Sequence, residues 1–162
     1  MKNPRIIIYT DGAAKGNPGP GGYGVVLKHK EKRKELSRGF RLTTNNRMEL
    51  LAVIVALETL KIEKSQVTIY TDSKYVSDAV QKGWVFQWEA KNFKKKKNPD
   101  LWKRFLIIYP RHQVKFVWVK GHANIPENER CDELAVSASE SNNLLVDEVY
   151  ESEMNEDQGN LF

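Results

Sequence analysis

Two near-identical segments, each ending in an aspartate and a small residue, contain the residues best suited to chemistry. Residues 8–12 read Ile-Tyr-Thr-Asp-Gly and residues 69–73 read Ile-Tyr-Thr-Asp-Ser, so Asp11 and Asp72 each follow a run of strand-forming residues. A carboxylate at the carboxyl end of a buried strand points toward the edge where open α/β sheets bind ligands. Two carboxylates side by side there need a cation between them, or one must stay protonated. Glu49, near an expected helix start, is a third candidate ligand, and the three acids together favour a metal site.

Apolar periodicity and turn residues predict the elements that would position these acids. The expected strands cover residues 6–10, 23–28, 36–42, 67–71 and 114–119, and the expected helices cover 47–61 and 73–80 and begin near 101 and at 126. Asn46 and Glu49 fit a capping box, and the glycine- and proline-rich residues 12–22 predict a loop. This order predicts an α/β fold with a five-stranded mixed sheet, in which strands 1, 4 and 5 are parallel, strands 2 and 3 are antiparallel, and helices cover both faces.

The charge distribution separates a basic body from an acidic tail. The 162 residues carry a net charge of +5, but every one of the 26 lysines and arginines lies before residue 131. Nine of the 21 acids lie after that point, so residues 1–130 carry a net charge of +14. Such an imbalance indicates a protein that binds polyanions with a salt-dependent affinity. We predict one domain over residues 1–141 and an acidic, mostly disordered tail over residues 142–162.

Cysteine content and hydropathy limit the class of protein. A single cysteine, Cys131, excludes a disulfide framework and cannot form a zinc site by itself, so we expect a small core residue there. No apolar run approaches the length of a membrane span, and no signal peptide is visible. These features predict a cytoplasmic protein.

Aromatic and basic residues are interleaved in residues 82–104. Trp84 and Trp88 are separated by one helical turn, and four consecutive lysines follow them at positions 94 to 97. Lysines neutralise phosphates, and the two tryptophans could flank a deoxyribose backbone. For Trp102, which precedes Lys103, we expect a place in the core instead.

Five groups of residues closely resemble, in order and spacing, the motifs of type 1 ribonuclease H of the bacterial kind. They are residues 9–12 (Tyr-Thr-Asp-Gly), 16–24 (Gly-Asn-Pro-Gly-Pro-Gly-Gly-Tyr-Gly), 43–50 (Thr-Thr-Asn-Asn-Arg-Met-Glu-Leu), 71–73 (Thr-Asp-Ser), and 120–123 (Lys-Gly-His-Ala) with 126–135. The resemblance covers about residues 5–140. It implies the ribonuclease H-like fold and a monomeric endonuclease that cleaves the RNA strand of RNA–DNA hybrids, leaving 3′-hydroxyl and 5′-phosphate ends. It also implies two Mg²⁺ ions per site, with Mn²⁺ as a substitute.

The resemblance assigns roles to individual residues. Those implied to be catalytic are the four metal-binding carboxylates, Asp11, Glu49, Asp72 and Asp132, and a histidine that assists proton transfer and product release, His122. Those implied to contact the hybrid are Asn17, Asn45 and Asn46 on the RNA strand, Thr44 and Asn98 in a phosphate pocket for the DNA strand, and Trp84, Trp88, Lys94, Lys95, Lys96 and Lys97 in a basic protrusion at about residues 82–100. Lys74 and Ala14 depart from residues seen in some relatives, so neither inherits a role.

Other interpretations of these residues remain open. Glu49 could merely close a capping box, Asp132 could be an exposed helix acid, and His122 could be an ordinary loop histidine. The same fold also serves transposases, integrases and junction resolvases, which cut DNA, and a non-catalytic hybrid-binding protein is a further alternative. The group Lys120-Gly121-His122 with Asp132, together with the asparagine pair, favours cleavage of RNA, and the presence of all four acids favours catalysis.

The last five residues, Gln158-Gly159-Asn160-Leu161-Phe162, resemble the short peptide by which bacterial replication and repair proteins bind the DNA sliding clamp. Gln158 would form a hydrogen bond, Leu161 and Phe162 would be the two apolar anchors, and the acidic stretch before them would be an extended tether. One alternative is an ordinary frayed terminus. Another is an acidic tail that folds back on the basic body, imitates nucleic acid and inhibits the protein.

Overall fold

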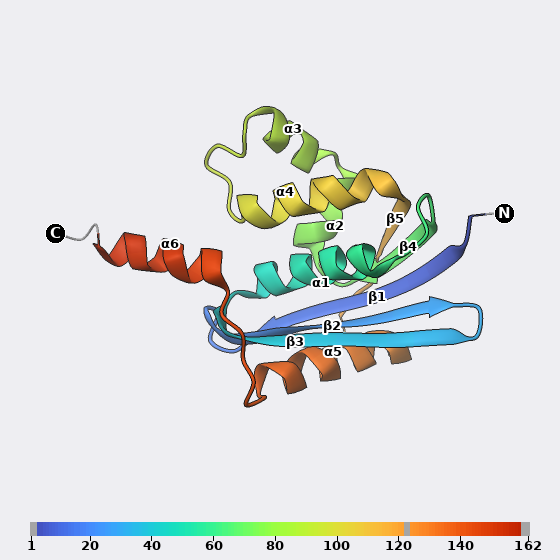
Figure 1. Ribbon diagram of the computed structural model, residues 1–162, viewed down its shortest axis with the longest axis horizontal. Coiled ribbons are helices and arrows are strands. Elements are labelled where there is room, and N and C mark those ends of the chain that lie inside the picture. The colour runs from blue at the N-terminus through green and yellow to red at the C-terminus, as the bar shows by residue number, and fades with distance from the viewer. Residues whose placement is uncertain (1–2, 122–123, 160–162) are drawn as a thin grey trace.

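One mixed sheet of five strands forms the centre of the molecule (Figure 1). The computed structural model describes residues 3–121 and 124–159, with only the backbone of residues 158 and 159. Its strands are β1 (Arg5–Ala14), β2 (Gly19–His29), β3 (Lys32–Thr43), β4 (Gln66–Thr71) and β5 (Gln113–Trp118). They lie in the order β3-β2-β1-β4-β5. β1, β4 and β5 are parallel and β2 and β3 are antiparallel, which confirms the predicted sheet.

Helices cover both faces of this sheet, as the sequence predicts. They are α1 (Asn45–Thr59), α2 (Lys74–Gln81), α3 (Trp84–Ala90), α4 (Pro99–Ile108), α5 (Pro126–Ser139) and α6 (Glu148–Gly159), with the 3₁₀ turn η1 (Tyr109–Arg111). Figure 1 shows α5 on one face and α1 with α4 on the other. Among the residues that the structure describes, no helix is long and apolar enough to cross a membrane.

Helix α1 is buried on almost every side because it lies between the sheet and α4. Its residues Leu50, Val53, Ile54 and Leu57 are fully buried. On its outer side, α4 contributes Trp102, which is also fully buried and packs edge-on against Phe105 and Trp88. The expectation that Trp102 belongs to the core is confirmed.

The glycine-rich segment after the first strand differs from the predicted loop. β1 continues to Ala14 and β2 begins at Gly19, so only residues 15–18 connect them. The reason is tertiary packing, since α5 lies very close to the sheet at these glycines. A Cβ atom on Gly24 would lie 2.2 Å from the carbonyl oxygen of Cys131, and Cys131 itself is fully buried, as expected.

The start of α1 also differs from the capping box predicted from Asn46 and Glu49. Thr44, with an extended backbone, is the N-cap, and its hydroxyl accepts a hydrogen bond from the backbone N–H of Arg47 at 3.2 Å. A threonine oxygen satisfies the otherwise unpaired N–H at the helix start as well as an asparagine does. Glu49 lies beyond this first turn and is available for a different contact.

The prediction of a mostly disordered tail was wrong for residues 148–159, which form α6. The segment before this helix adds a bridge to the sheet edge, where Leu145 pairs with Phe40 and exchanges backbone hydrogen bonds with Gly39 and Arg41. Asp147, directly before α6, is buried against Arg47. The local composition of the tail by itself indicates disorder, because it contains no signal of a partner 100 residues away in the sequence. The division into domains otherwise stays a prediction.

Candidate active site

The two repeated segments lie side by side. β1 and β4 are parallel neighbours, with Tyr9 paired to Tyr70 and their rings stacked at a centroid distance of 5.0 Å. Asp11, in β1, and Asp72, directly after β4, each lie two residues beyond this pair, so both carboxylates emerge at the same edge of the sheet. The register of two identical strand phrases thus produces the pair of acids that the sequence predicts.

Glu49 joins Asp11 and Asp72 as a third carboxylate because α1 passes unusually close to β1. The backbone N–H of Gly12 donates to Asp11 Oδ1 at 2.9 Å and to Glu49 Oε1 at 3.0 Å. A Cβ atom on Gly12 would lie 2.4 Å from the backbone nitrogen of Glu49, which is shorter than any normal contact. The glycine after Asp11 is therefore the residue that lets the helix bring its carboxylate to the strand end.

The three carboxylates form a compact, oxygen-only cluster. One carboxylate oxygen each from Asp11, Glu49 and Asp72 lies within 4.8 Å of the others. Burial, with smaller contributions from the charges of Asp72 and Asp132, raises the pKa of Asp11 to about 7. Burial, followed by the Asp11 charge, raises the pKa of Glu49 well above its usual range. Three carboxylates this close together repel one another in the ionised state, so a cation between them would stabilise that state.

The donor set fits a hard divalent cation. Glu49 Oε2 is buried and has no hydrogen-bond partner among the described residues, so this oxygen can ligate a metal. Mg²⁺ and similar ions prefer carboxylate oxygens, and the described cluster contains no sulfur or imidazole ligand. Asp11, Glu49 and Asp72 are the residues that would hold such an ion.

Asp132 borders the same site from the opposite face of the sheet. It lies on α5 and is exposed, and it lines a cavity of about 380 Å³ together with Asp11, Glu49 and Asp72. The structure therefore brings all four predicted carboxylates around one cavity, although only three of them form the close cluster. His122, the fifth predicted catalytic residue, lies outside the described residues, and its role stays a prediction.

Of the predicted RNA-contacting asparagines, Asn45 borders this cavity, whereas Asn17 and Asn46 line a second cavity. Asn45 lines the cavity, and its side-chain oxygen accepts a short hydrogen bond from the backbone N–H of Ala14. Asn17 accepts from the backbone N–H of Asn45 at 3.0 Å, and Asn46 is exposed beside it. These contacts tie the β1–β2 connection to the start of α1, so the asparagines are fixed relative to the acids.

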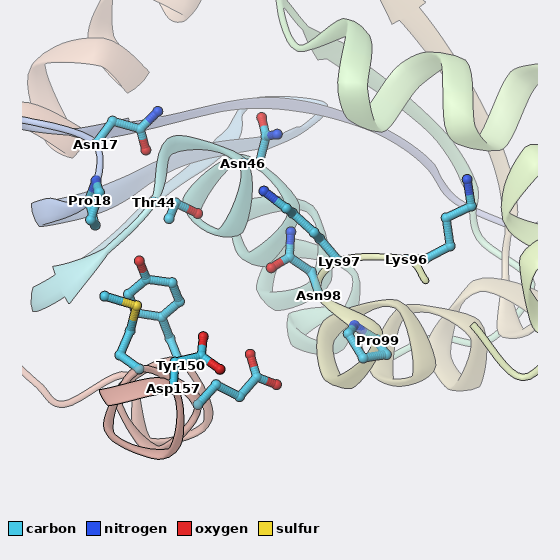
Figure 2. Close-up of a pocket in the computed structure, with 12 residues that line it drawn as sticks. Asn17, Pro18, Thr44, Asn46, Lys96, Lys97, Asn98, Pro99, Tyr150 and Asp157 are labelled. Carbon is cyan, nitrogen blue, oxygen red and sulfur yellow. The ribbon is translucent and has the colours of Figure 1, made fainter. Parts of the chain in front are cut away.

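The predicted phosphate-pocket residues Thr44 and Asn98 meet in a second cavity, of about 550 Å³ (Figure 2). Asn98 donates to the Tyr75 hydroxyl at 3.0 Å and accepts from Arg47 at 3.2 Å, so its orientation is fixed from two sides. Asn17, Asn46, Lys96 and Lys97 line the same cavity, whereas Lys94 and Lys95 are exposed beside it on the connection from α3 to α4.

Arg47 is the residue of this region that sequence reasoning missed. Its guanidinium is 3% exposed and binds both carboxylate oxygens of Asp147 and both of Asp100, at 2.7 to 3.0 Å. Thr43 also donates to Asp147, at 2.8 Å. The planar guanidinium of arginine has five N–H donors, so it can bind two carboxylates at the same time. One arginine therefore joins the starts of α1, α4 and α6. The signal for it in the sequence was an arginine in the first turn of a strongly apolar helix.

The two tryptophans of the predicted protrusion have different environments on α3. Trp84 is 41% exposed and Lys82 Nζ lies 5.1 Å from the centre of its ring. Trp88 is half-buried, with one face near Trp102 and Lys96 Nζ 5.1 Å from its ring centre. Both remain accessible to a ligand on the side where the lysines lie, with Trp88 also contributing to the core.

Lys74 has a defined position beside the carboxylate cluster. Its Nζ lies 4.7 Å from the ring centre of Trp118, whose indole N–H donates to the carbonyl oxygen of Asp72 at 3.0 Å. The sequence alone assigns Lys74 no role. The structure places its positive charge at the edge of the site.

Comparisons with known proteins identify the family of this chain. The family described as RNase H matches residues 3–140. The chain is 59% identical over 153 residues to a ribonuclease H of Rippkaea orientalis, which covers 91% of this chain and 93% of that protein. It is 61% identical over 147 residues to a ribonuclease H of Desulforamulus reducens, with 88% and 92% covered.

Solved structures show the same fold. The crystal structure of LC9-RNase H1, a type 1 RNase H, is similar with a TM-score of 0.77 and 31% identity, over 86% of this chain and 74% of that one. The structure of LC11-RNase H1 in complex with RNA/DNA hybrid is similar with a TM-score of 0.60 and 32% identity, over 83% and 96%. The family match and these relatives show that the chain belongs to the bacterial type 1 ribonuclease H family, and the carboxylate cluster is consistent with this.

Proposed function

We propose that this protein is an endonuclease that hydrolyses the RNA strand of RNA–DNA hybrids with two divalent cations, preferably Mg²⁺, and leaves 3′-hydroxyl and 5′-phosphate ends. The observation that carries the proposal is the cluster of Asp11, Glu49 and Asp72, whose oxygens lie within 4.8 Å of one another beside a basic surface. The relative whose structure was solved with RNA/DNA hybrid supports the same substrate.

Some residues of the site would bind the metal ions, and others orient the metal-binding carboxylates. Bound divalent cations activate water and neutralise charge on the leaving oxygen of a phosphodiester. Asp11, Glu49 and Asp72 would hold the cations, and Asp132 would add negative charge from the side of the cavity formed by α5. The N–H of Gly12 orients two of these carboxylates, so the ligand oxygens are fixed before metal or substrate binds. For His122, proton transfer to the leaving group remains the expected role.

The surface around the site can distinguish the two strands. Asn45 lines the acidic cavity, and Asn17 and Asn46 line the second cavity. Their amide groups can hydrogen-bond to the 2′-hydroxyls of an RNA strand, which a DNA strand lacks. Thr44 and Asn98, which also line the second cavity, would bind a phosphate of the DNA strand, and the lysines at positions 94 to 97 would neutralise the neighbouring phosphates.

A direct cleavage assay tests this proposal. Incubated with end-labelled RNA–DNA hybrid, duplex RNA and duplex DNA, the protein should cut only the RNA strand of the hybrid, and only when Mg²⁺ or Mn²⁺ is added. Analysis of the products should identify 3′-hydroxyl and 5′-phosphate ends. Cleavage of duplex DNA at a similar rate would favour the DNA-cutting enzymes of the same fold, and hybrid binding without cleavage would favour a non-catalytic protein.

The C-terminal peptide is proposed to bind the bacterial DNA sliding clamp. Leu161 and Phe162 lie outside the described residues, and Gln158 lies in the last turn of α6, so the expected extended tether is helical up to this point. Leu161→Ala with Phe162→Ala should abolish binding to the cognate clamp and leave cleavage of short free hybrids unchanged, because the anchors are remote from the acids in sequence. Calorimetry with wild type and the double variant measures this, and a wild type that does not bind the clamp contradicts it.

A further inference from the structure

An acidic helix faces the surface that the proposed function assigns to the DNA strand. The second cavity has one wall of cationic and polar residues and a second wall formed by α6. The residues of the first wall include Thr44, Asn46, Lys96, Lys97 and Asn98, and those of the second are Tyr150, Glu153, Met154 and Asp157. Figure 2 shows Tyr150 and Asp157 across the cavity from Thr44 and Asn98.

The spacing of the α6 residues explains why this wall is acidic. Positions 150, 153, 154 and 157 follow one another at three- and four-residue intervals, so they form one stripe along the helix. The opposite stripe contains Glu148, Glu151 and Glu156, which line a different groove next to Arg41. The acids of α6 therefore divide into a set that faces the proposed DNA-binding surface and a set that faces away from it.

The position of α6 is set by ion pairs at its first turn. Asp147, directly before the helix, is bound by the buried Arg47 at 2.7 Å, and Glu151 is bound by Arg41 at 2.8 Å from the other side. The same Arg47 orients Asn98 in the first wall. The two walls are thus attached to one buried cation, and their separation does not depend on the flexible ends of exposed side chains.

A phosphodiester backbone in this cavity would experience opposing forces. Lys96 and Lys97 attract it, whereas Glu153 and Asp157 repel it and also reduce the effective charge of the lysines. All four side chains are exposed, so each interaction is modest and is screened beyond about 10 Å at 0.1 M salt. The net effect on a polyanion is a lower affinity than the basic wall alone would provide.

We propose that the Glu153–Asp157 stripe of α6 is a built-in electrostatic competitor of the DNA-strand backbone, which weakens the binding of hybrids to the Thr44–Asn98 surface. This inference rests on the proposed function, because it requires that a hybrid binds with its DNA strand in this cavity. The competitor acts by charge and position, and α6 remains attached to the body through Asp147 when substrate binds.

Neutralising this stripe tests the proposal. Glu153→Gln with Asp157→Asn should tighten hybrid binding about threefold to tenfold at roughly 50 mM salt, because two repulsive charges are removed and each exposed charge interaction is individually weak. The matched control, Glu148→Gln with Glu156→Gln, removes the same charge from the other stripe of the same helix and should change the affinity by less than about twofold. Binding is measured by fluorescence anisotropy in EDTA, so that no cleavage occurs, over a series of salt concentrations.

A modified substrate identifies the strand involved. On a hybrid whose DNA strand carries neutral methylphosphonate linkages, the gain of the Glu153/Asp157 variant should disappear, and on a hybrid with an unmodified DNA strand it should shrink as salt rises. An equal gain from both double variants, no gain from either, or a gain that persists on the neutral DNA strand would each overturn the proposal. A wild type that neither binds nor cleaves hybrids would overturn the proposed function, and this inference with it. Normal cleavage by wild type with equal affinity of all variants would overturn the inference alone.

Discussion

Replacing Asp11 with Asn should reduce hybrid cleavage by about a thousandfold or more and leave hybrid binding nearly unchanged. Asn keeps the shape of the side chain but removes a ligand charge, and the metal-dependent stabilisation it supports amounts to several kcal/mol. We expect binding to depend on the basic surface around α3 and on the lysines at positions 94 to 97, which are not part of the carboxylate cluster. Single-turnover cleavage and anisotropy binding on one preparation measure both quantities. Cleavage within tenfold of wild type would contradict the metal assignment.

Two controls separate this effect from misfolding and from weak binding. In the absence of metal, the Asp11→Asn protein should be at least as stable as wild type at neutral pH, because burial raises the pKa of Asp11 to about 7 and the substitution removes a carboxylate whose ionisation opposes folding. Alanine at Lys94, Lys95, Lys96 and Lys97 should produce the opposite kinetic pattern: weaker binding with a smaller salt dependence, and little change in the rate at saturation.

Replacing Arg47 with Ala should lower the free energy of unfolding by about 3–5 kcal/mol, because it leaves the Asp147 and Asp100 carboxylates without their cation in a buried site. Arg47 is 3% exposed and pairs with Asp147, which is 8% exposed. The loss should be accompanied by loss of α6 helicity, since Asp147 attaches this helix to the body. Urea denaturation followed by circular dichroism measures both.

Arg104 provides the matched control for Arg47. It also binds a carboxylate through two nitrogens, that of Glu58, but both side chains are substantially exposed, at 46% and 35%. Arg104→Ala should therefore cost no more than about 1 kcal/mol. Equal losses from Arg47→Ala and Arg104→Ala would show that the buried ion cluster contributes nothing beyond a surface pair.

The strands and the principal acids could be predicted because their signals are local. Runs such as residues 6–10 and 67–71 are apolar without alternation, which is typical of strands buried on both faces, and their shared ending places Asp11 and Asp72 at the same sheet edge once the strands are neighbours. The motif resemblance added Asp132 and the asparagines and supported Glu49, which composition alone could not distinguish from caps and surface acids.

The remaining features depend on contacts between residues distant in sequence. Arg47 donates hydrogen bonds to Asn98 and Asp147, which lie 51 and 100 residues away in the sequence. Its contact with Asp147 attaches α6 to the body, although the composition of this segment is typical of disorder. The close passage of α1 over Gly12 determines that Glu49 is a cluster member and not a helix cap.

The sequence by itself determined the order of the five strands and of helices α1, α2, α4 and α5, the sheet, the acidic site and the basic surface, because periodicity, motif spacing and charge counts are properties of the chain. The tertiary structure alone decided which acids form the compact cluster, which tryptophan face is buried, and that an acidic helix stands opposite the proposed DNA-strand surface. The physical reason is that burial and charge pairing depend on distances in space, and these are set only when the helices pack on the sheet.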